Sequence, residues 1–411
     1  MAARTNGSRT HHRNIPMAND CVERLAKASA SWPAKLSSPR TLVLQAAAFC
    51  NISCSYCYLS TTHQRGIQSK DVLEAVAARI VSNLEGDCTV LWQSGEPLVA
   101  PISYYRYATD LFETCKPSNV NLKYSLQTNA TLVTKEVAAA LKELDIVVGV
   151  SLDGPKDIHD FNRKTRQGYG THEKAIQGLD LLSNAGVRPY VFCVLTKNSL
   201  SRCQELFDYF ELLGIRHLSF FPEEIAGKNK TWDQADESLF AEFFAEYLHH
   251  IISSRSLQTV TEFTSVIRGK YLPSPFKANA MTIPGGTMTV SLHGELCTFG
   301  PELRDDPQYP RSIVLGNVCD PSLFSTIDTA AFRNLCEEIG RGVAICEANC
   351  EYYAACGGGN PSWKFGEFGR FDVSETHSCR TRFKAVDAAL KRVLDQPNHI
   401  KPFLTSAGLN R

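Results

Sequence analysis

The feature that most constrains the fold of this chain is an alternation of strand-like and helix-like segments between residues 40 and 222. Six runs rich in apolar, β-branched or aromatic residues begin at positions 41, 89, 121, 146, 190 and 217. Such runs are typical of buried parallel strands. The segments between them carry apolar residues at helical spacing, and Ser69, Thr134 and Thr171 are placed to begin helices. Six successive β-α units predict a parallel sheet with right-handed crossovers.

A barrel and a doubly wound sheet would both accommodate these units. The first strand is not followed by G-x-G-x-x-G, and G-x-x-x-x-G-K does not occur, so nucleotide-binding folds lack their usual motifs. The unusual residues follow the strands: Cys50 after the first, SGEP after the second, TN after the third and DGP after the fourth. Chemistry in barrels gathers at the carboxyl ends of the strands. We therefore predict an α/β fold with a partial (β/α)6 barrel that is similar to a TIM barrel.

The pattern changes after residue 222. A helix is predicted from Glu237, a hairpin that turns at His293 and Gly294 follows, and a cysteine-rich stretch precedes a last helix from Arg382. We place a domain boundary near residue 280. The predicted regions are a disordered or extended segment at 1–39, the barrel with its following helices at 40–280, and a cysteine-rich domain with a C-terminal helix at 281–411.

Composition limits the partners and the location. The 43 Lys and Arg residues balance 43 Asp and Glu residues, so no excess charge points to nucleic acid or to an anionic membrane as a partner. No apolar run reaches the roughly 18 residues that a membrane span requires. The polar, basic N-terminus lacks the apolar segment of a secretory signal. We therefore expect a cytoplasmic protein.

Fifteen cysteines are many for such a chain. A reducing cytoplasm disfavours disulfides, so clustered thiols there more often bind metal or carry out redox chemistry. Cys50, Cys54 and Cys57 supply three soft ligands from one short loop. Four ligands would close a tetrahedral zinc site, whereas an iron–sulfur cube held by three thiolates leaves one iron open. The spacing is compatible both with zinc and a distant fourth ligand and with an open cluster.

This motif and its setting resemble the radical SAM enzymes. The CxxxCxxC loop carries an aromatic residue, Tyr56, before its last cysteine and follows the first predicted strand. SGEP at residues 94–97 resembles the loop with which that family holds the methionyl amino group of S-adenosylmethionine. VGVSLDGP ends the fourth strand with Ser151, and HDFNR follows with Arg163. The resemblance implies a cofactor site at these strand ends.

The resemblance also implies the chemistry. Cys50, Cys54 and Cys57 would hold a [4Fe–4S] cluster whose open iron chelates S-adenosylmethionine, and reductive cleavage would give a 5′-deoxyadenosyl radical. A barrel suits a radical because it keeps water away. The other positions that the resemblance places at the cofactor are Tyr56, Gly95, Glu96, Gln127, Asn129, Ser151 and Arg163.

A second group of cysteines lies in the tail. Cys346, Cys350, Cys356 and Cys379 can complete a four-thiolate site, for which zinc and an iron–sulfur cluster compete on spacing alone. Beside a radical SAM core the arrangement resembles the SPASM-type auxiliary domain. That resemblance implies an auxiliary [4Fe–4S] cluster with no open iron, which would conduct electrons or clamp the structure.

The SPASM pattern is incomplete in this chain. Asn360 stands where the fuller pattern has another cysteine, and Cys346 and Cys350 are separated by three residues instead of two. Upstream, Cys297 and Cys319 lie on either side of LGNV and could be remnants of a second auxiliary site. We therefore predict at least one auxiliary cluster.

Three longer stretches point to one group within this family. They resemble maturases that build three-residue cyclophanes in ribosomally made peptides, and they are CEYYAACGGGNP and GRFDVSETHSCR in the tail and WQSGEPLVAPISYY in the barrel. The implied reaction takes hydrogen from a side-chain β-carbon and joins that carbon to an aromatic ring. We expect Glu223 or Glu224, after the sixth strand, to accept the proton released at the end. The implied partners are a precursor peptide and a reductase, flavodoxin or ferredoxin.

Other functions share these features. Sulfatase maturases that oxidise a cysteine or serine to formylglycine have the same domain plan, and a thioether-forming maturase would need a cysteine in its peptide. From a different class, the chain could be an iron–sulfur regulatory or scaffold protein without catalysis. SGEP and HDFNR argue against that class, because a pure binding protein has no need of contacts to S-adenosylmethionine.

Overall fold

The six predicted strands form the centre of one sheet. The computed structural model describes residues 32–224, 229, 237–272, 278–305 and 308–394, so most of the predicted N-terminal segment lies outside the described residues. The six strands pair in parallel and in chain order, which confirms the prediction. They are β1 (Thr41–Leu44), β3 (Cys88–Trp92), β4 (Leu122–Thr128), β5 (Val147–Ser151), β7 (Tyr190–Leu195) and β8 (His217–Pro222).

Further strands extend this sheet at both edges. β9 (Thr259–Val260) adds to β8 in parallel, and β10 (Thr287–Val290) adds to β1 in parallel. The predicted hairpin is confirmed: β11 (Glu295–Thr298) runs antiparallel to β10, and β12 (Val314–Asn317) follows it at the edge. The sheet therefore continues across residue 280, where we placed a domain boundary. A separate ribbon pairs β2 (Ile52–Cys54) with β6 (Arg163–Thr165).

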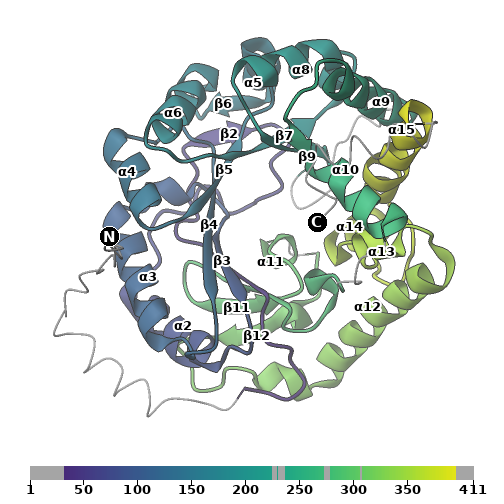
Figure 1. The fold of residues 1–411 in the computed structure, drawn as a ribbon. Helices are drawn as coiled ribbons and strands as arrows, with labels where there is room; N and C mark the ends of the chain where they lie inside the picture. Colours follow the sequence, from purple (N-terminus) through teal and green to yellow (C-terminus); the bar gives the residue numbers. More distant parts are fainter. Residues whose placement is uncertain (1–31, 225–228, 230–236, 273–277, 306–307, 395–411) are drawn as a thin grey trace, which may run out of the picture.

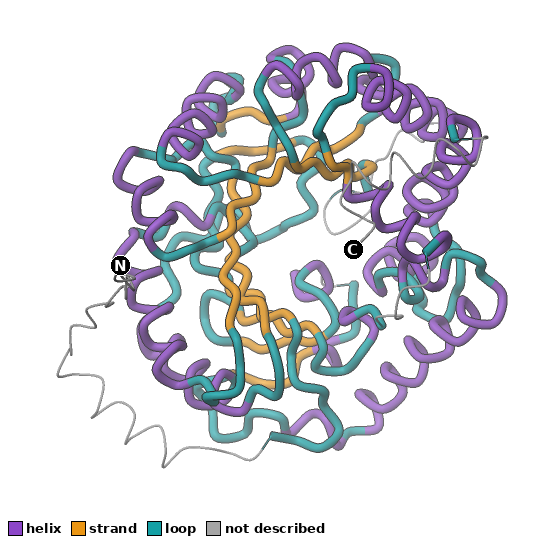
Figure 2. Tube along the Cα trace, viewed as in Figure 1, coloured by secondary structure: helices purple, strands orange, loops and turns teal. Residues whose placement is uncertain are grey.

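Helices cover the outer face of the curved sheet, so that the strands lie inside a ring of helices (Figures 1 and 2). Ser69 and Thr134 cap their helices as predicted, because their side chains accept backbone hydrogen bonds from Val72 and Val137. The helices of the barrel are α2 (Lys70–Arg79), α3 (Ile102–Cys115), α4 (Lys135–Glu143), α5 (Lys156–Asn162), α6 (His172–Asn184), α7 (Lys197–Leu200) and α8 (Cys203–Leu212).

The rest of the chain folds back on the barrel. The last helix packs against α9, which follows β8, and the two lie side by side in Figure 1. The later helices are α9 (Glu237–Ser253), α10 (Thr261–Val266), α11 (Glu302–Asp305), α12 (Ala330–Asn349), α13 (Tyr353–Cys356), α14 (Pro361–Phe368) and α15 (Ala385–Val393). Short 3₁₀ turns lie at Val81–Asn83, Pro97–Val99, Ala280–Thr282, Arg311–Ile313 and Ser325–Asp328, and π-helical turns at Ile267–Tyr271 and Cys379–Lys384.

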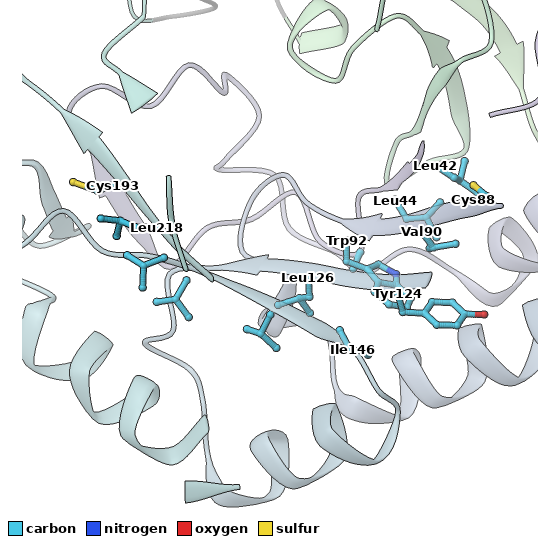
Figure 3. Close-up of a cluster of buried hydrophobic side chains, with 14 of the residues drawn as sticks. Leu42, Leu44, Cys88, Val90, Trp92, Tyr124, Leu126, Ile146, Cys193 and Leu218 are labelled. Atoms are coloured by element: carbon cyan, nitrogen blue, oxygen red, sulfur yellow. The ribbon is translucent and has the colours of Figure 1, made fainter. Parts of the chain in front are cut away.

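The core lies between the sheet and these helices. Trp92, Leu126 and Val148 come from three adjacent strands and are each 0% exposed, and Figure 3 shows Trp92 and Leu126 within the buried cluster. The indole of Trp92 stacks on Tyr124, with ring centroids 5.7 Å apart. Apolar burial of this kind fixes the strand register and so the edge at which the strands end. Among the described helices, none has the length and apolar character to cross a membrane.

We predict that Leu126→Ala lowers the free energy of unfolding by about 2–5 kcal/mol, because the truncation leaves a cavity in this core. The matched control is Leu212→Ala, whose side chain is 86% exposed and should change stability by less than about 0.5 kcal/mol. Denaturant unfolding of both variants measures the difference. Equal losses would contradict the assignment of the core.

Candidate active site

The three clustered cysteines lie on a loop that begins after β1. The backbone N–H of Cys57 donates to the carbonyl oxygen of Cys54 (3.2 Å), and Cys54 ends β2, which pairs with β6. Burial raises the pKa of the Cys50 thiol to about 12, and the Glu96 carboxylate and the other two thiols contribute to the same rise. The three sulfur atoms are thus near enough to interact electrostatically, as ligands of one cluster must be.

The SGEP loop after β3 packs directly on the chain that leads to Cys50. Gly95 has φ +63°, and a Cβ there would lie 2.4 Å from the carbonyl oxygens of Ala47 and Ala48. The next backbone N–H, that of Glu96, donates to the carbonyl oxygen of Phe49 (2.9 Å). Only glycine permits this approach, because any side chain would collide with the backbone.

Glu96 joins the loops after β3 and β4. Its side chain, in a residue only 1% exposed, accepts hydrogen bonds from the Leu98 N–H (3.0 Å), the Thr128 hydroxyl (2.6 Å) and the Asn129 N–H (2.8 Å). Burial raises the pKa of Glu96, and these donors oppose the rise. The amide of Asn129 in turn lies 3.8 Å from the Cys50 sulfur. The structure therefore brings two predicted cofactor residues together beside the cysteine loop.

Gln127 and Ser151 form a second predicted pair. They lie at the ends of the adjacent strands β4 and β5, and Nε2 of Gln127 donates to the Ser151 hydroxyl (2.9 Å). Gly149 makes room for this pair, since a Cβ there would lie 2.1 Å from Oε1 of Gln127. The pair presents both an amide and a hydroxyl at the carboxyl edge of the sheet.

Asp153 is a site residue that the sequence analysis did not single out. Its fully buried carboxylate accepts two hydrogen bonds from Arg163, at 2.9 Å from Nε and 3.0 Å from Nη2. It also accepts from the Tyr56 hydroxyl and from the Val194 N–H. The remaining nitrogen of the guanidinium, Nη1, lies 4.0 Å from the Cys54 sulfur. Because a buried charge needs an opposite charge, Asp153 holds Arg163 against the cysteine loop.

Asp160, the acidic residue of HDFNR, caps the N-terminus of α6. Oδ1 of Asp160 accepts hydrogen bonds from the backbone N–H groups of Thr171 (2.7 Å) and His172 (2.8 Å). Backbone N–H groups at a helix N-terminus have no acceptor within the helix, so the Asp160 carboxylate stabilises α6 by accepting from them. Thr171 begins α6 as predicted, although its own side chain does not cap it.

Three of the four tail cysteines, Cys350, Cys356 and Cys379, line a cavity of about 180 Å³, and the fourth, Cys346, interacts electrostatically with Cys350 and Cys379. Cys346 lies in the last turn of α12, Cys356 ends α13, and Cys379 begins a π-helical turn. The pKa of each of Cys346, Cys356 and Cys379 is raised, mainly by burial, with contributions from the neighbouring thiols. The structure therefore gathers all four predicted ligands at one site.

A buried lysine that the sequence analysis missed lies against this site. Lys364 on α14 is 2% exposed, and its Nζ lies 4.0 Å from the Cys346 sulfur. Burial lowers the pKa of Lys364, while the thiolates of Cys346, Cys379 and Cys356 oppose that shift. A buried ammonium needs negative partners, and a metal centre with four thiolates would supply them.

Cys297 and Cys319 are not brought together. Cys297 is fully buried in β11 and pairs with Val314, whereas Glu295 pairs with Asn317 at the other end of the same strands. Cys319 lies beyond that other end, exposed, with its sulfur 4.0 Å from the Asp71 carbonyl oxygen. This register separates the two thiols, so a second auxiliary site that uses both gains no support.

Glu224, which follows β8, contacts the cysteine-rich tail. Trp363 Nε1 donates to its Oε2 (2.6 Å), and the Ser378 hydroxyl donates to its Oε1 (3.2 Å). Burial raises the pKa of Glu224 to about 7; the Arg382 charge opposes this rise and the Glu302 charge adds to it. A carboxyl group with such a pKa can exchange a proton near neutral pH.

The other candidate proton acceptor, Glu223, directly follows β8. Its Oε1 accepts a hydrogen bond from the Asn229 amide (3.2 Å), and its backbone N–H donates to the Leu195 carbonyl oxygen (2.9 Å). Within the described ranges, no group of three His, Cys, Asp or Glu residues is placed for a single metal ion.

Comparison with known proteins identifies the family. A model of the radical SAM superfamily matches residues 45–209. The chain is 30% identical over 366 residues to the uncharacterized protein sll1766 of Synechocystis sp., across 86% of this chain and 92% of that protein. The chain belongs to the radical SAM superfamily.

More distant similarities cover most of this radical SAM enzyme. It is 26% identical over 384 residues to a cysteine-type anaerobic sulfatase-maturating enzyme of Clostridium perfringens, across 88% of this chain and 98% of that enzyme. Its fold matches native anSMEcpe with bound AdoMet and Cp18Cys peptide (TM-score 0.70, 22% identity, 88% and 99% of the two chains). It also matches Streptococcus suis SuiB bound to precursor peptide SuiA (TM-score 0.56, 17% identity, 92% and 84%).

Radical SAM enzymes use a [4Fe–4S] cluster and S-adenosylmethionine, and the strand ends fit these groups. The Ser94 hydroxyl is buried at the SGEP loop and has no hydrogen-bond partner among the described residues. An additional polar ligand at this edge could satisfy that hydroxyl. Assembly of a cluster on thiols with raised pKa values, such as Cys50, would release protons.

We predict that Asp153→Asn lowers the free energy of unfolding by about 3–5 kcal/mol, because it leaves the buried Arg163 charge without its partner. The matched control is Asp157→Asn, which breaks an exposed pair with Arg202 and should cost less than about 1 kcal/mol. Denaturant unfolding of the cluster-free protein measures both. If the two losses were equal, Asp153 would not anchor the site.

Proposed function

We propose that this radical SAM enzyme modifies a ribosomally synthesised precursor peptide by joining an aromatic ring to a side-chain β-carbon. Peptide or protein modification is supported by the similarity to a sulfatase-maturating enzyme over nearly the whole chain and by the fold shared with SuiB, which was solved with its precursor peptide. The tail stretches CEYYAACGGGNP and GRFDVSETHSCR support the cyclophane product.

The strand-end residues would hold the cofactors. Cys50, Cys54 and Cys57 would ligate the first cluster, and the carboxyl edge of the sheet would bind S-adenosylmethionine. When bound, these groups supply a 5′-deoxyadenosyl radical that removes a hydrogen atom from the substrate. Asp153 would orient Arg163, and Glu96 would fix the loops after β3 and β4. The proposed cofactor contacts are Tyr56, Gly95, Glu96, Gln127, Asn129, Ser151 and Arg163.

The observation that carries the crosslinking proposal is the position of Glu224 between the barrel and the auxiliary cysteines. Closing an aromatic crosslink releases one proton and one electron from the substrate. Glu224 would take the proton; its place after a barrel strand and its pKa of about 7 support this role. Its two donors are the chain neighbours of Lys364 and Cys379. The site of Cys346, Cys350, Cys356 and Cys379 would hold an auxiliary cluster that accepts the electron.

The first test is the mass of a co-expressed precursor peptide after anaerobic reaction. We expect a loss of two hydrogens per crosslink and one 5′-deoxyadenosine per event, because the product is oxidised by one electron pair. Cys54→Ala should abolish both signals. The control Cys336→Ala, which changes a thiol of α12 outside both cysteine groups, should retain them.

The same assay separates the alternatives. A product that reacts with hydrazides would carry an aldehyde and would favour formylglycine formation, the activity of the sulfatase-maturating relatives. A product that forms only on cysteine-containing peptides, with loss of the free thiol, would favour a thioether. An unchanged peptide mass with the true substrate would refute peptide crosslinking, and absence of 5′-deoxyadenosine would favour the non-catalytic scaffold.

The second test is the pH dependence of crosslinking. A proton acceptor must be deprotonated, so the crosslinking rate should fall by up to about tenfold per pH unit below pH 7. Glu224→Gln should remove this dependence and lower the crosslinked yield, while 5′-deoxyadenosine is still formed. Glu223→Gln is the control and should keep the native profile. A Glu224→Gln variant with the native profile would exclude Glu224 as the acceptor.

A further inference from the structure

The surface beside the cysteine loop has a one-sided charge. Residues 49–67 and 161–170, which frame the loop and include β6, contain no Asp or Glu. They carry the exposed Arg65, Lys164 and Arg166, in a chain whose basic and acidic residues are equal in number. The fourth cation of these segments, Arg163, is buried and paired with Asp153. This face therefore has a local positive charge that its own segments do not neutralise.

These cations are attached to the cysteine loop itself. Lys164 in β6 lies opposite Ser53 in β2, one residue from Cys54, and paired strands are only about 4.8 Å apart. Nε of Arg166 donates to the carbonyl oxygen of Cys50 (2.9 Å). The guanidinium groups of Arg166 and Arg65 lie 4.8 and 5.3 Å from the centre of the Phe49 ring. A partner that touches these cations would therefore lie directly over the proposed cluster ligands.

Exposed aromatic side chains flank the same strand. Tyr169 is 73% exposed and Phe161 is 62% exposed, and the Lys164 ammonium lies 5.9 Å from the Phe161 ring. Of the described aromatic residues with large exposure, these two are the most exposed. Exposed aromatic residues beside arginine are typical of protein interfaces. The nearest acid of α5, Asp160, is used at the N-terminus of α6.

We propose that this docking face, defined by Arg65, Phe161, Lys164, Arg166 and Tyr169, binds an acidic one-electron carrier protein of the flavodoxin or ferredoxin class. The proposal rests on the proposed role of Cys50, Cys54 and Cys57 as cluster ligands. A positive face attracts an acidic partner and accelerates its association. In the transfer itself the carrier is oxidised by one electron and the cluster is reduced by one, and no bond forms or breaks.

The test compares a protein donor with a small one. Substrate-free formation of 5′-deoxyadenosine is measured with reduced flavodoxin, with reduced ferredoxin and with dithionite, each at low and at physiological ionic strength. The variant is Arg65→Glu with Lys164→Glu; Arg166 is left unchanged because it supports the Cys50 loop. The matched control is Lys123→Glu with Lys142→Glu, two exposed lysines at the opposite end of the barrel strands.

We expect the charge-reversed variant to raise the KM for the carrier by about tenfold or more, while the control variant stays at the native value. Added salt should raise the native KM and have little effect on the variant, because salt screens the attraction. Rates with dithionite and the iron content should be the same in all three proteins, since a small reductant needs no docking face.

Several outcomes would overturn the proposal. The variant could keep the native KM for both carriers, or the native enzyme could accept electrons from neither. A dithionite rate that falls with the carrier rate would mean that the two cations serve only the loop. A defect confined to crosslinking of the precursor peptide would assign the face to an acidic peptide instead. The assay contains no peptide, so its result does not depend on whether the crosslinking proposal is right. If the native enzyme formed no 5′-deoxyadenosine with dithionite, both the cluster assignment and the docking face would be refuted.

Discussion

Buried carboxylates that require hydrogen-bond donors hold this enzyme together. Glu96 ties the loop after β3 to the end of β4, and Asp153 ties Arg163 to the end of β5. Glu262, 3% exposed, accepts from Ser219, from the Phe220 N–H and from Arg382 in the tail. Leaving such a group unpaired is costly, so each one fixes the segments that supply its donors. Glu96 and Asp153 therefore position the loops of the site through contacts within the protein itself.

The sequence predicts the parts of this arrangement that depend on local pattern. The six strands could be found because each is a short, continuous apolar run, and Ser69 could be assigned as a cap because its partner is three residues away. The pairing of β10 with β1 could not be found, because it joins residues more than 240 positions apart. Asp153 was missed for the same reason: it reads as a turn residue in DGP, and only the fold shows it beneath Arg163. Its position directly after a buried strand was the available signal.

The cysteine-rich tail shows what spacing leaves undecided. Spacing predicts that Cys346, Cys350, Cys356 and Cys379 meet; in the structure the last three line one cavity, and Cys346 lies near enough to Cys350 and Cys379 to interact with them. Spacing gives no register for Cys297 and Cys319; in the structure Cys297 pairs with Val314 at the start of β12, whereas Cys319 lies beyond the end of that strand. It also gives no indication of Lys364, an ordinary helix residue in the sequence whose ammonium lies at a thiol. A cation beside thiolates stabilises the more negative state of a cluster, so Lys364 would favour electron acceptance by an auxiliary cluster held at this site.

The charged residues at the Cys50 loop and those at the tail lie in different parts of the protein, so the first electron would arrive at one place and the proton would leave at another. The exposed Lys164 and Arg166 lie beside the cysteine loop, whereas Glu224 contacts Trp363 of the tail and Lys364 lies at Cys346. Trp363 and Lys364 are consecutive on α14, so one helix positions both a donor to Glu224 and a cation at Cys346. A shift of α14 would therefore move the proton acceptor and the auxiliary site together. Such coupling would allow a substrate radical to lose its proton and its electron in one place, away from the face at which we propose that the carrier protein docks.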